Sequence, residues 1–195
     1  MNKKLTKLAL AAALVLGGSP ALAEQYVVKL ENPLGDISPG LQETLKISVI
    51  ERFEAEGANF VVLDVVNDGY LETFVNAKNL RPLAISKVDF INSPVVGGGD
   101  ASPQTASAEH QTFVIERPIP GVGSFPLEKK EGISRASNAA IERMNGSVEW
   151  VHSYLTDVGT YCIYRATDEG QIVEHAELAG APLGPITAVE RIPSK

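Results

Sequence analysis

The sequence predicts an α+β fold whose second half follows the ferredoxin-like order β-α-β-β-α-β. The main observation is the stretch VEWVHSYLTDVGTYCIYRA (residues 148–166), where two alternating apolar runs flank a Thr-Asp-Val-Gly turn. This pattern is typical of a β-hairpin. A helical pattern lies on each side of the hairpin, and strand-like segments at residues 110–119 and 186–192 enclose both. The order predicts an antiparallel sheet with both helices on one face.

The first half begins with a predicted strand at residues 25–31, which ends at Asn32 and Pro33. Ser38 and Pro39 then form an N-cap and a first helical position. Apolar residues follow at helical spacing until Gly57, namely Leu41, Leu45, Val49 and Phe53. This spacing predicts a helix of about five turns.

Three further elements are predicted in the first half. Residues 59–66 (NFVVLDVV) are apolar enough for a strand buried on both faces. Residues 71–78 fit either a helix or a strand, and Pro82 favours the helix because it would end one. Residues 84–91 (AISKVDFI) are predicted to form another strand.

The first half is a candidate degenerate repeat of the second. QYVVKLENPLGDIS (residues 25–38) can be laid without gaps on QTFVIERPIPGVGS (residues 111–124), which matches Gly35 with Gly121. The first half is shorter, however, and its pattern lacks the second strand of a hairpin. An unrelated α/β domain is therefore the alternative.

Residues 92–109 (NSPVVGGGDASPQTASAE) are rich in glycine, proline and small polar residues. This composition predicts a flexible linker between two domains, residues 24–91 and 110–195. In the second domain, the helices flanking the hairpin are expected at about residues 126–144 and 168–179, and Asn145-Gly146 is the stop signal of the first.

The N-terminus has the pattern of a secretory signal peptide spanning residues 1–23. Three lysines precede an apolar run from Leu8 to Leu16, and Ala21-Leu22-Ala23 forms a small-residue cleavage site. We therefore expect a periplasmic or secreted protein, cleaved after Ala23. No later apolar run approaches the roughly 20 residues of a membrane span.

Charge and cysteine content exclude some functions. The chain carries a formal net charge of −7 and no basic block, which argues against nucleic-acid binding. Cys162 is the only cysteine, so an internal disulfide is impossible. The sequence contains no nucleophile elbow and no phosphate-binding glycine loop, and we assign no catalytic residue.

The second domain resembles a family of small bacterial ferredoxin-like proteins first catalogued as a domain of unknown function, one member of which is described as a nickel-binding protein. The resemblance covers nearly all of residues 111–192. Its blocks are FVIERPIPG, the Ser137-Asn138 pair, WVHSYLTD, YCIYRA, EHAELAGAP and ITAVERI. It implies a sheet-to-sheet α+β barrel, closed by the first domain or by a homodimer partner, and binding of Ni²⁺ or another divalent transition metal.

The faces of the hairpin suggest candidate metal ligands. If Thr156 pairs with Thr160, one sheet face carries Trp150, His152, Tyr154, Cys162 and Tyr164. Glu116 has the parity to join them from the first strand. Imidazole, thiolate and carboxylate can all bind Ni²⁺, so His152, Cys162 and Glu116 are the predicted metal ligands. The alternatives are a hydrogen-bonded structural or acid-base role for His152, and a buried, inert Cys162.

The same register assigns the remaining residues. The layer facing the helices is expected to contain Phe113, Ile115, Val151, Leu155 and Ile163. The aromatic layer on the other side then needs a second sheet to cover it. Additional candidate ligand contacts are Trp150, Tyr154, Tyr164 and His175. His175 is expected on an inner helix face and not at the same ion as His152.

Three functions remain open from the sequence. The leading hypothesis is a periplasmic or secreted protein that binds a divalent transition metal. The first alternative is a small-molecule-binding or enzymatic barrel that uses a pocket between sheets. The second is an interaction module without a small ligand.

Overall fold

The computed structural model describes residues 23–102 and 107–193, so the predicted signal peptide lies outside the described residues apart from Ala23. The first half has the complete order β-α-β-β-α-β. Its elements are β1 (Glu24–Leu30), α1 (Pro39–Leu45), β2 (Ile47–Glu54), β3 (Asn59–Val65), α2 (Asp68–Ala77) and β4 (Pro82–Lys87). The strands lie side by side in the order β4-β1-β3-β2, and each pair is antiparallel.

The second half repeats this arrangement. It consists of β6 (Gln111–Arg117), the short 3-10 helix η2 (Val122–Ser124), α3 (Leu127–Glu142), β7 (Val148–Leu155), β8 (Thr160–Ala166), α4 (Glu169–Ala179) and β9 (Ile186–Ile192). The strand order β9-β6-β8-β7 matches that of the first half, again with antiparallel pairs. The predicted α+β class and ferredoxin-like second half are confirmed.

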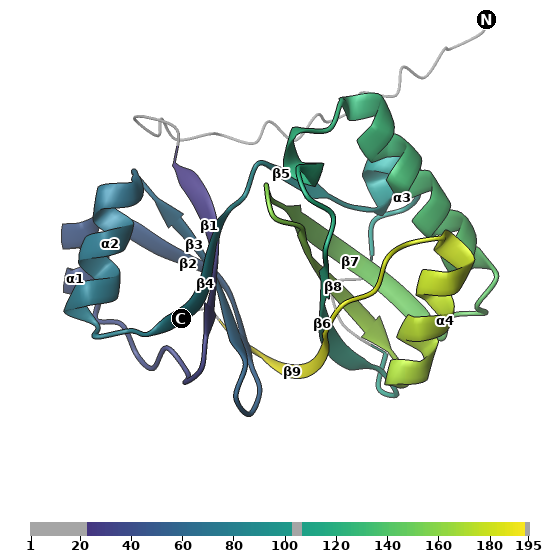
Figure 1. The fold of residues 1–195 in the computed structure, drawn as a ribbon. Coiled ribbons are helices and arrows are strands. Elements are labelled where there is room, and N and C mark those ends of the chain that lie inside the picture. Colours follow the sequence, from purple (N-terminus) through teal and green to yellow (C-terminus); the bar gives the residue numbers. More distant parts are fainter. Residues whose placement is uncertain (1–22, 103–106, 194–195) are drawn as a thin grey trace, which may run out of the picture.

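The two sheets pack face to face, and the helices cover their outer faces, with α1 and α2 on one side and α3 and α4 on the other (Figure 1). The inner faces bury a shared apolar core made of Val27, Phe53, Phe60, Val62, Val114, Tyr154, Tyr161 and Ile163. At one edge β2 pairs with β9, which joins the two sheets. Both sheets of the barrel are therefore supplied by one chain.

Equivalent glycines show how closely the halves correspond. Gly35 follows β1 and Gly121 follows β6, and both have left-handed backbone angles, with φ of 68° and 72°. Glycine adopts this conformation at little cost because it has no Cβ. The glycine match in the sequence thus marks the same turn in both halves.

The predicted five-turn helix after Ser38 is wrong. Helix α1 ends at Leu45, Lys46 adopts a left-handed conformation, and the chain continues as β2. The run Ile47-Ser48-Val49-Ile50 contains three β-branched apolar residues, which favour a strand. Pairing with β3 supplies the second strand of the hairpin that the sequence pattern lacked. The helix favoured for residues 71–78 is present within α2.

The predicted strand at residues 84–91 is interrupted. Strand β4 ends at Lys87, and Phe90–Asn92 forms a separate short strand, β5, which pairs with the outer edge of β7. Part of the predicted flexible linker is also ordered. Pro94–Gly97 forms a 3-10 helix, η1, that packs against α3, where the Asn138 amide donates to the Pro94 carbonyl at 2.9 Å. A Cβ at Gly97 would lie 2.6 Å from the backbone nitrogen of Arg135, so glycine is required for this close packing.

The predicted register of the central hairpin is also wrong. Leu155 pairs with Thr160, because the Thr156 N–H and hydroxyl both donate to the Gly159 carbonyl and place Thr156 in the turn. A β-bulge at Val151 adds one residue to β7. A shift of one residue moves side chains to the opposite sheet face.

Because of this register, the predicted aromatic face is divided between two sides of the sheet. Trp150, Cys162 and Tyr164 belong to the core beneath α3 and α4, whereas Tyr154 belongs to the core between the sheets. Val151 and Ile163, predicted to face the helices, pack in the core between the sheets instead. Phe113 and Ile115 face the helices as predicted.

Within the described ranges, no helix combines the length and apolar character that crossing a membrane requires.

Candidate functional site

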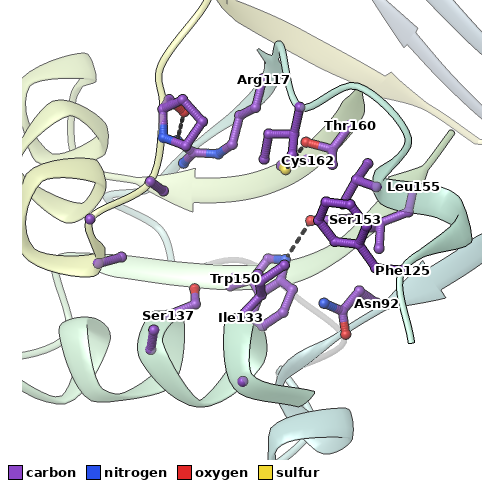
Figure 2. A pocket seen from close by; sticks show the side chains of 18 of the residues that line it. Asn92, Arg117, Phe125, Ile133, Ser137, Trp150, Ser153, Leu155, Thr160 and Cys162 are labelled. Atoms are coloured by element: carbon purple, nitrogen blue, oxygen red, sulfur yellow. Dashed lines mark hydrogen bonds between the residues drawn. The ribbon is translucent and has the colours of Figure 1, made fainter. Parts of the chain in front are cut away.

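The candidate site is a pocket of about 640 Å³ in the second half, between the sheet face of β6, β7 and β8 and the helices α3 and α4 (Figure 2). The chain that follows β6 and the chain that follows α4 also contribute to its walls. Most of the lining is apolar. It includes Pro118, Ile119, Pro120, Val122, Phe125, Ile133, Ala136, Trp150, Leu155, Cys162, Ala179, Ala181 and Pro182.

The β7 bulge and two close backbone approaches shape this pocket. The bulge turns Trp150 toward the helices, where its ring stacks on Tyr164 with 6.1 Å between ring centroids. At the end of β6, a Cβ at Gly159 would lie 2.3 Å from the Arg117 carbonyl oxygen, and a Cβ at Gly184 would lie 2.4 Å from that of Glu116. These two glycines let the neighbouring loops pack directly on the backbone that carries Arg117.

Arg117 is the charged residue buried at the pocket. It is 5% exposed, and its Nη1 donates to the Pro182 carbonyl oxygen at 2.7 Å. The Nη2 atom is buried without a hydrogen-bond partner. No aspartate or glutamate lines the pocket, so no carboxylate there neutralises the guanidinium. Buried charges without a paired group are costly in proteins.

A polar network connects α3, β8 and α4 beside this charge. The Ser137 hydroxyl lies 3.0 Å from the Tyr164 hydroxyl and 3.1 Å from His175 Nε2. Burial, together with the positive charge of Arg117, lowers the pKa of His175 to about 4. The imidazole is therefore neutral near pH 7, and its Nδ1 is buried without a partner. Burial also raises the pKa of Tyr164.

The other polar groups at the pocket bond to one another. The Trp150 indole N–H donates to the Ser153 hydroxyl at 2.9 Å (Figure 2), and the Thr160 hydroxyl lies 3.0 Å from Cys162 Sγ. Ser134 on α3 donates to Asn92 at 2.6 Å. These groups fix the shape of the walls and leave Arg117 and His175 as the lining residues that hold unpartnered buried polar atoms.

A second polar cluster lies between the two sheets. Glu51 on β2 accepts from Tyr154 at 2.7 Å and from Arg191 at 2.8 Å, and lies 2.8 Å from His152 Nε2. Burial alone would raise the pKa of Glu51, but the hydrogen bonds and positive charge around it lower the pKa overall. Burial raises the pKa of Tyr154, and the Glu51 charge adds to that effect. These hydrogen bonds connect Glu51 of the first half to three residues of the second half.

The three predicted metal ligands are not brought together. His152 faces Glu51 on the opposite sheet, while Cys162 lies on the other side of its own sheet beneath the helices. Glu116 forms an ion pair with Lys29 of β1 at 2.7 Å. The physical reason is the pairing of Leu155 with Thr160, which places His152 opposite Ile163 and Cys162 opposite Ser153, on different sheet faces. Across residues 23–102 and 107–193, no three or more His, Cys, Asp or Glu side chains are grouped so that they could hold a metal ion.

The predicted ligand contacts divide in the same way. Trp150, Tyr164 and His175 all line the helix-side pocket, whereas Tyr154 does not. The sequence interpretation missed Arg117 altogether. A signal was present, because Arg117 follows Phe113 and Ile115 at strand spacing and so shares their helix-facing side. A charged residue that continues a row of apolar, helix-facing residues on a strand is the sequence feature that could have identified Arg117.

Comparisons with known proteins agree with this architecture. Residues 113–189 match the family model described as nickel responsive protein SCO4226-like. A mutant chlorite dismutase from Candidatus Nitrospira defluvii is similar in structure with a TM-score of 0.52 and 10% identity, over 87% of this chain and 91% of that one. The same enzyme in complex with imidazole gives a TM-score of 0.51 and 10% identity, over 87% and 90%. At this identity the likeness shows the α+β barrel fold alone. The curated proteins compared with the chain gave no match.

Proposed function

We propose that this protein binds a small, largely apolar organic molecule in the pocket between α3, α4 and the sheet. The observation that carries the proposal is the pocket itself, which has a volume of about 640 Å³ and a mainly apolar lining. Small-molecule sites typically measure about 300–1,000 Å³ and combine apolar walls with a few polar groups. Arg117 and His175 supply such groups here.

The position of the pocket differs from the alternative considered from the sequence. The alternative considered from the sequence was a ligand pocket between the sheets. That space is filled by the shared core and by the Glu51 cluster. The helix-side pocket lies within the segment matched by the family model. A structurally similar chlorite dismutase has been obtained with imidazole, which supports an α+β barrel as a scaffold for small ligands.

Nile red, a neutral apolar dye whose emission rises in apolar surroundings, tests the proposal. We expect saturable binding of one dye per protein. Ala136 is an exposed residue of α3 that lines the pocket, so Ala136→Phe places a ring over it and should weaken binding at least about tenfold. Ala139 is also exposed on α3 but does not line the pocket, so Ala139→Phe is the matched control. Absence of saturable binding, or equal binding by both variants, would contradict the proposal.

A second candidate is binding of a divalent transition metal such as nickel, which the family match favours. The described residues do not fit a closed nickel site, because they contain no group of three suitable ligands. His152 and Glu51 are two suitable ligand side chains that lie together, but His152 Nε2 and Glu51 Oε2 are 2.8 Å apart and hydrogen-bonded to each other.

Calorimetric titration of the mature protein with Ni²⁺ tests this candidate. Stoichiometric binding that is lost in His152→Ala and retained in Cys162→Ala would support it, since Cys162 faces away from His152. A wild type that binds no stoichiometric Ni²⁺, Cu²⁺ or Zn²⁺ would exclude it.

We also propose that the mature chain is periplasmic or secreted. The support is the lysine-rich start, the apolar run and the small-residue cleavage pattern of residues 1–23. N-terminal sequencing of the protein from a bacterial periplasmic extract should begin at Glu24. Recovery of uncleaved protein from the cytoplasm alone would contradict the proposal.

A further inference from the structure

We infer that the ligand of the helix-side pocket is an apolar carboxylic acid whose carboxylate pairs with Arg117. This inference rests on the proposed function, because it names the chemical class of the molecule bound in that pocket. It goes further by assigning the specificity-determining residue, which the family match does not identify.

The charges around the pocket carry the first step. The pocket is lined by two cationic side chains, Arg117 and Lys129, and by no aspartate or glutamate. This is unexpected in a chain with 24 acidic and 17 basic residues. Arg117 is 5% exposed, so its charge is largely removed from bulk water. An anionic ligand would neutralise a charge that is otherwise costly to bury.

The geometry of Arg117 carries the second step. Its Nη1 donates to the Pro182 carbonyl, which restrains one side of the guanidinium group and leaves Nη2 as a donor without a partner. Arginine pairs with planar carboxylates through such donors, and a fixed guanidinium loses less freedom on binding. Figure 2 shows the side chains of Arg117, Cys162 and Trp150 around one pocket. A ligand in this pocket would therefore contact both the charge and the apolar walls.

The remaining polar and apolar groups complete the recognition. His175 Nδ1 is the other unpartnered buried atom of the lining, and a neutral imidazole can bond a second polar group of a ligand. Trp150, Phe125 and Leu155 provide apolar surface for the body of the molecule. The volume is too large for a two-carbon acid to fill, so the class is a carboxylic acid with an aromatic or extended aliphatic body.

Matched pairs of neutral and charged competitors test the inference. We would displace Nile red from the protein at pH 7.5 with 2-naphthoate and 2-naphthamide, and with 4-phenylbutyrate and 4-phenylbutyramide. Each amide keeps the shape of its acid and removes the charge. We expect each acid to compete at least about tenfold better than its amide on the wild type. The quenching of Trp150, the single tryptophan, provides an independent readout of occupancy.

Substitutions identify the residue responsible. Arg117→Met should abolish the preference, so that each acid and its amide compete equally well. Arg117→Lys should retain part of the preference, because it keeps the charge but not the planar fork. Arg143 is an exposed arginine outside the pocket lining, so Arg143→Met is the matched control for lost charge.

Each result decides one of the two proposals. Equal competition by acids and amides on the wild type would overturn the inference and leave the proposed function standing. A preference that persists in Arg117→Met would also overturn it. Absence of Nile red binding would instead overturn the proposed function. If Arg117→Met does not fold, the wild-type comparison and Arg117→Lys still decide the outcome.

Discussion

At the scale of single residues, the charge of Arg117 affects the protonation of His175. Arg117 is buried at the end of β6, and its positive charge adds to the effect of burial in keeping the His175 imidazole neutral. The ring is also held by Ser137 and lies 4.9 Å from the Tyr164 ring, centroid to centroid. A group held neutral in the folded state makes the stability of the fold depend on pH.

We predict that stability increases with pH between about pH 4 and 6.5 because of His175. In this range the unfolded chain binds a proton at His175, whereas the folded chain, with a pKa of about 4, does not. Acidification therefore favours unfolding, by up to about 3 kcal/mol at the low end. Urea denaturation at pH 4.5, 5.5 and 7 measures this dependence.

His175→Asn is the variant that isolates this effect, because it removes the titrating group. It should be less stable than the wild type at pH 7, since the bond to Ser137 is altered, but its stability should vary less with pH. The carboxylate of Glu51, whose pKa is lowered, also loses stabilising contacts in acid and affects both proteins equally. Equal pH dependence in both proteins would show that His175 does not contribute.

At the scale of elements, the sequence predicts those of the second half well. The predicted strand at residues 186–192 coincides with β9, and the predicted helix at residues 168–179 differs from α4 by one residue. These segments have clear apolar periodicity, and Asp168 and Gly180 mark the ends of α4 by local capping.

The elements that the sequence did not predict depend on distant contacts. Residues 47–54 fit a helix by spacing, but β3 lies beside them and selects the strand. The single strand predicted at residues 84–91 is divided, because Phe90–Asn92 pairs with the edge of β7, far along the chain, as the separate strand β5. The bulge at Val151 is a single extra residue of ordinary type, and no local pattern marks it.

The register of the hairpin determines how much of the candidate site could be predicted. The residues chosen for their chemistry include four that line the pocket, namely Trp150, Cys162, Tyr164 and His175. Their grouping failed because Thr156 was paired with Thr160 in place of Leu155, and this shift of one residue moved His152 and Cys162 to the same face. A site on a sheet can therefore be predicted from parity only where the register is known.

At the scale of the whole molecule, the first half covers the inner sheet face of the second. Val114, Tyr154, Tyr161 and Ile163 of the second half are buried against Val27, Phe53, Phe60 and Val62 of the first. The Glu51 cluster and the β2-β9 pairing add polar and backbone contacts across the same boundary. The helix-side pocket lies on the opposite face of the second sheet, so its walls do not include residues of β1 to β4.

We predict that the second half alone, residues 88–195, self-associates through the exposed inner face. The fragment keeps β5, which pairs with β7, but exposes four large apolar side chains that the first half normally covers. Two such sheets can cover each other, because the two halves of the intact protein already pack in this way. Size-exclusion chromatography with light scattering should give a dimer for the fragment and a monomer for the mature full chain.

Ile163→Lys in the fragment places a charge at the centre of this face and should convert the dimer to a monomer. Leu127→Lys is the matched control, because Leu127 is exposed at the start of α3 and lies outside the sheet. The fragment retains all the residues that line the pocket, so a folded dimer should still bind Nile red. A fragment that is monomeric and unfolds cooperatively would show that the second half is stable without a covering sheet, and that the first half has another role.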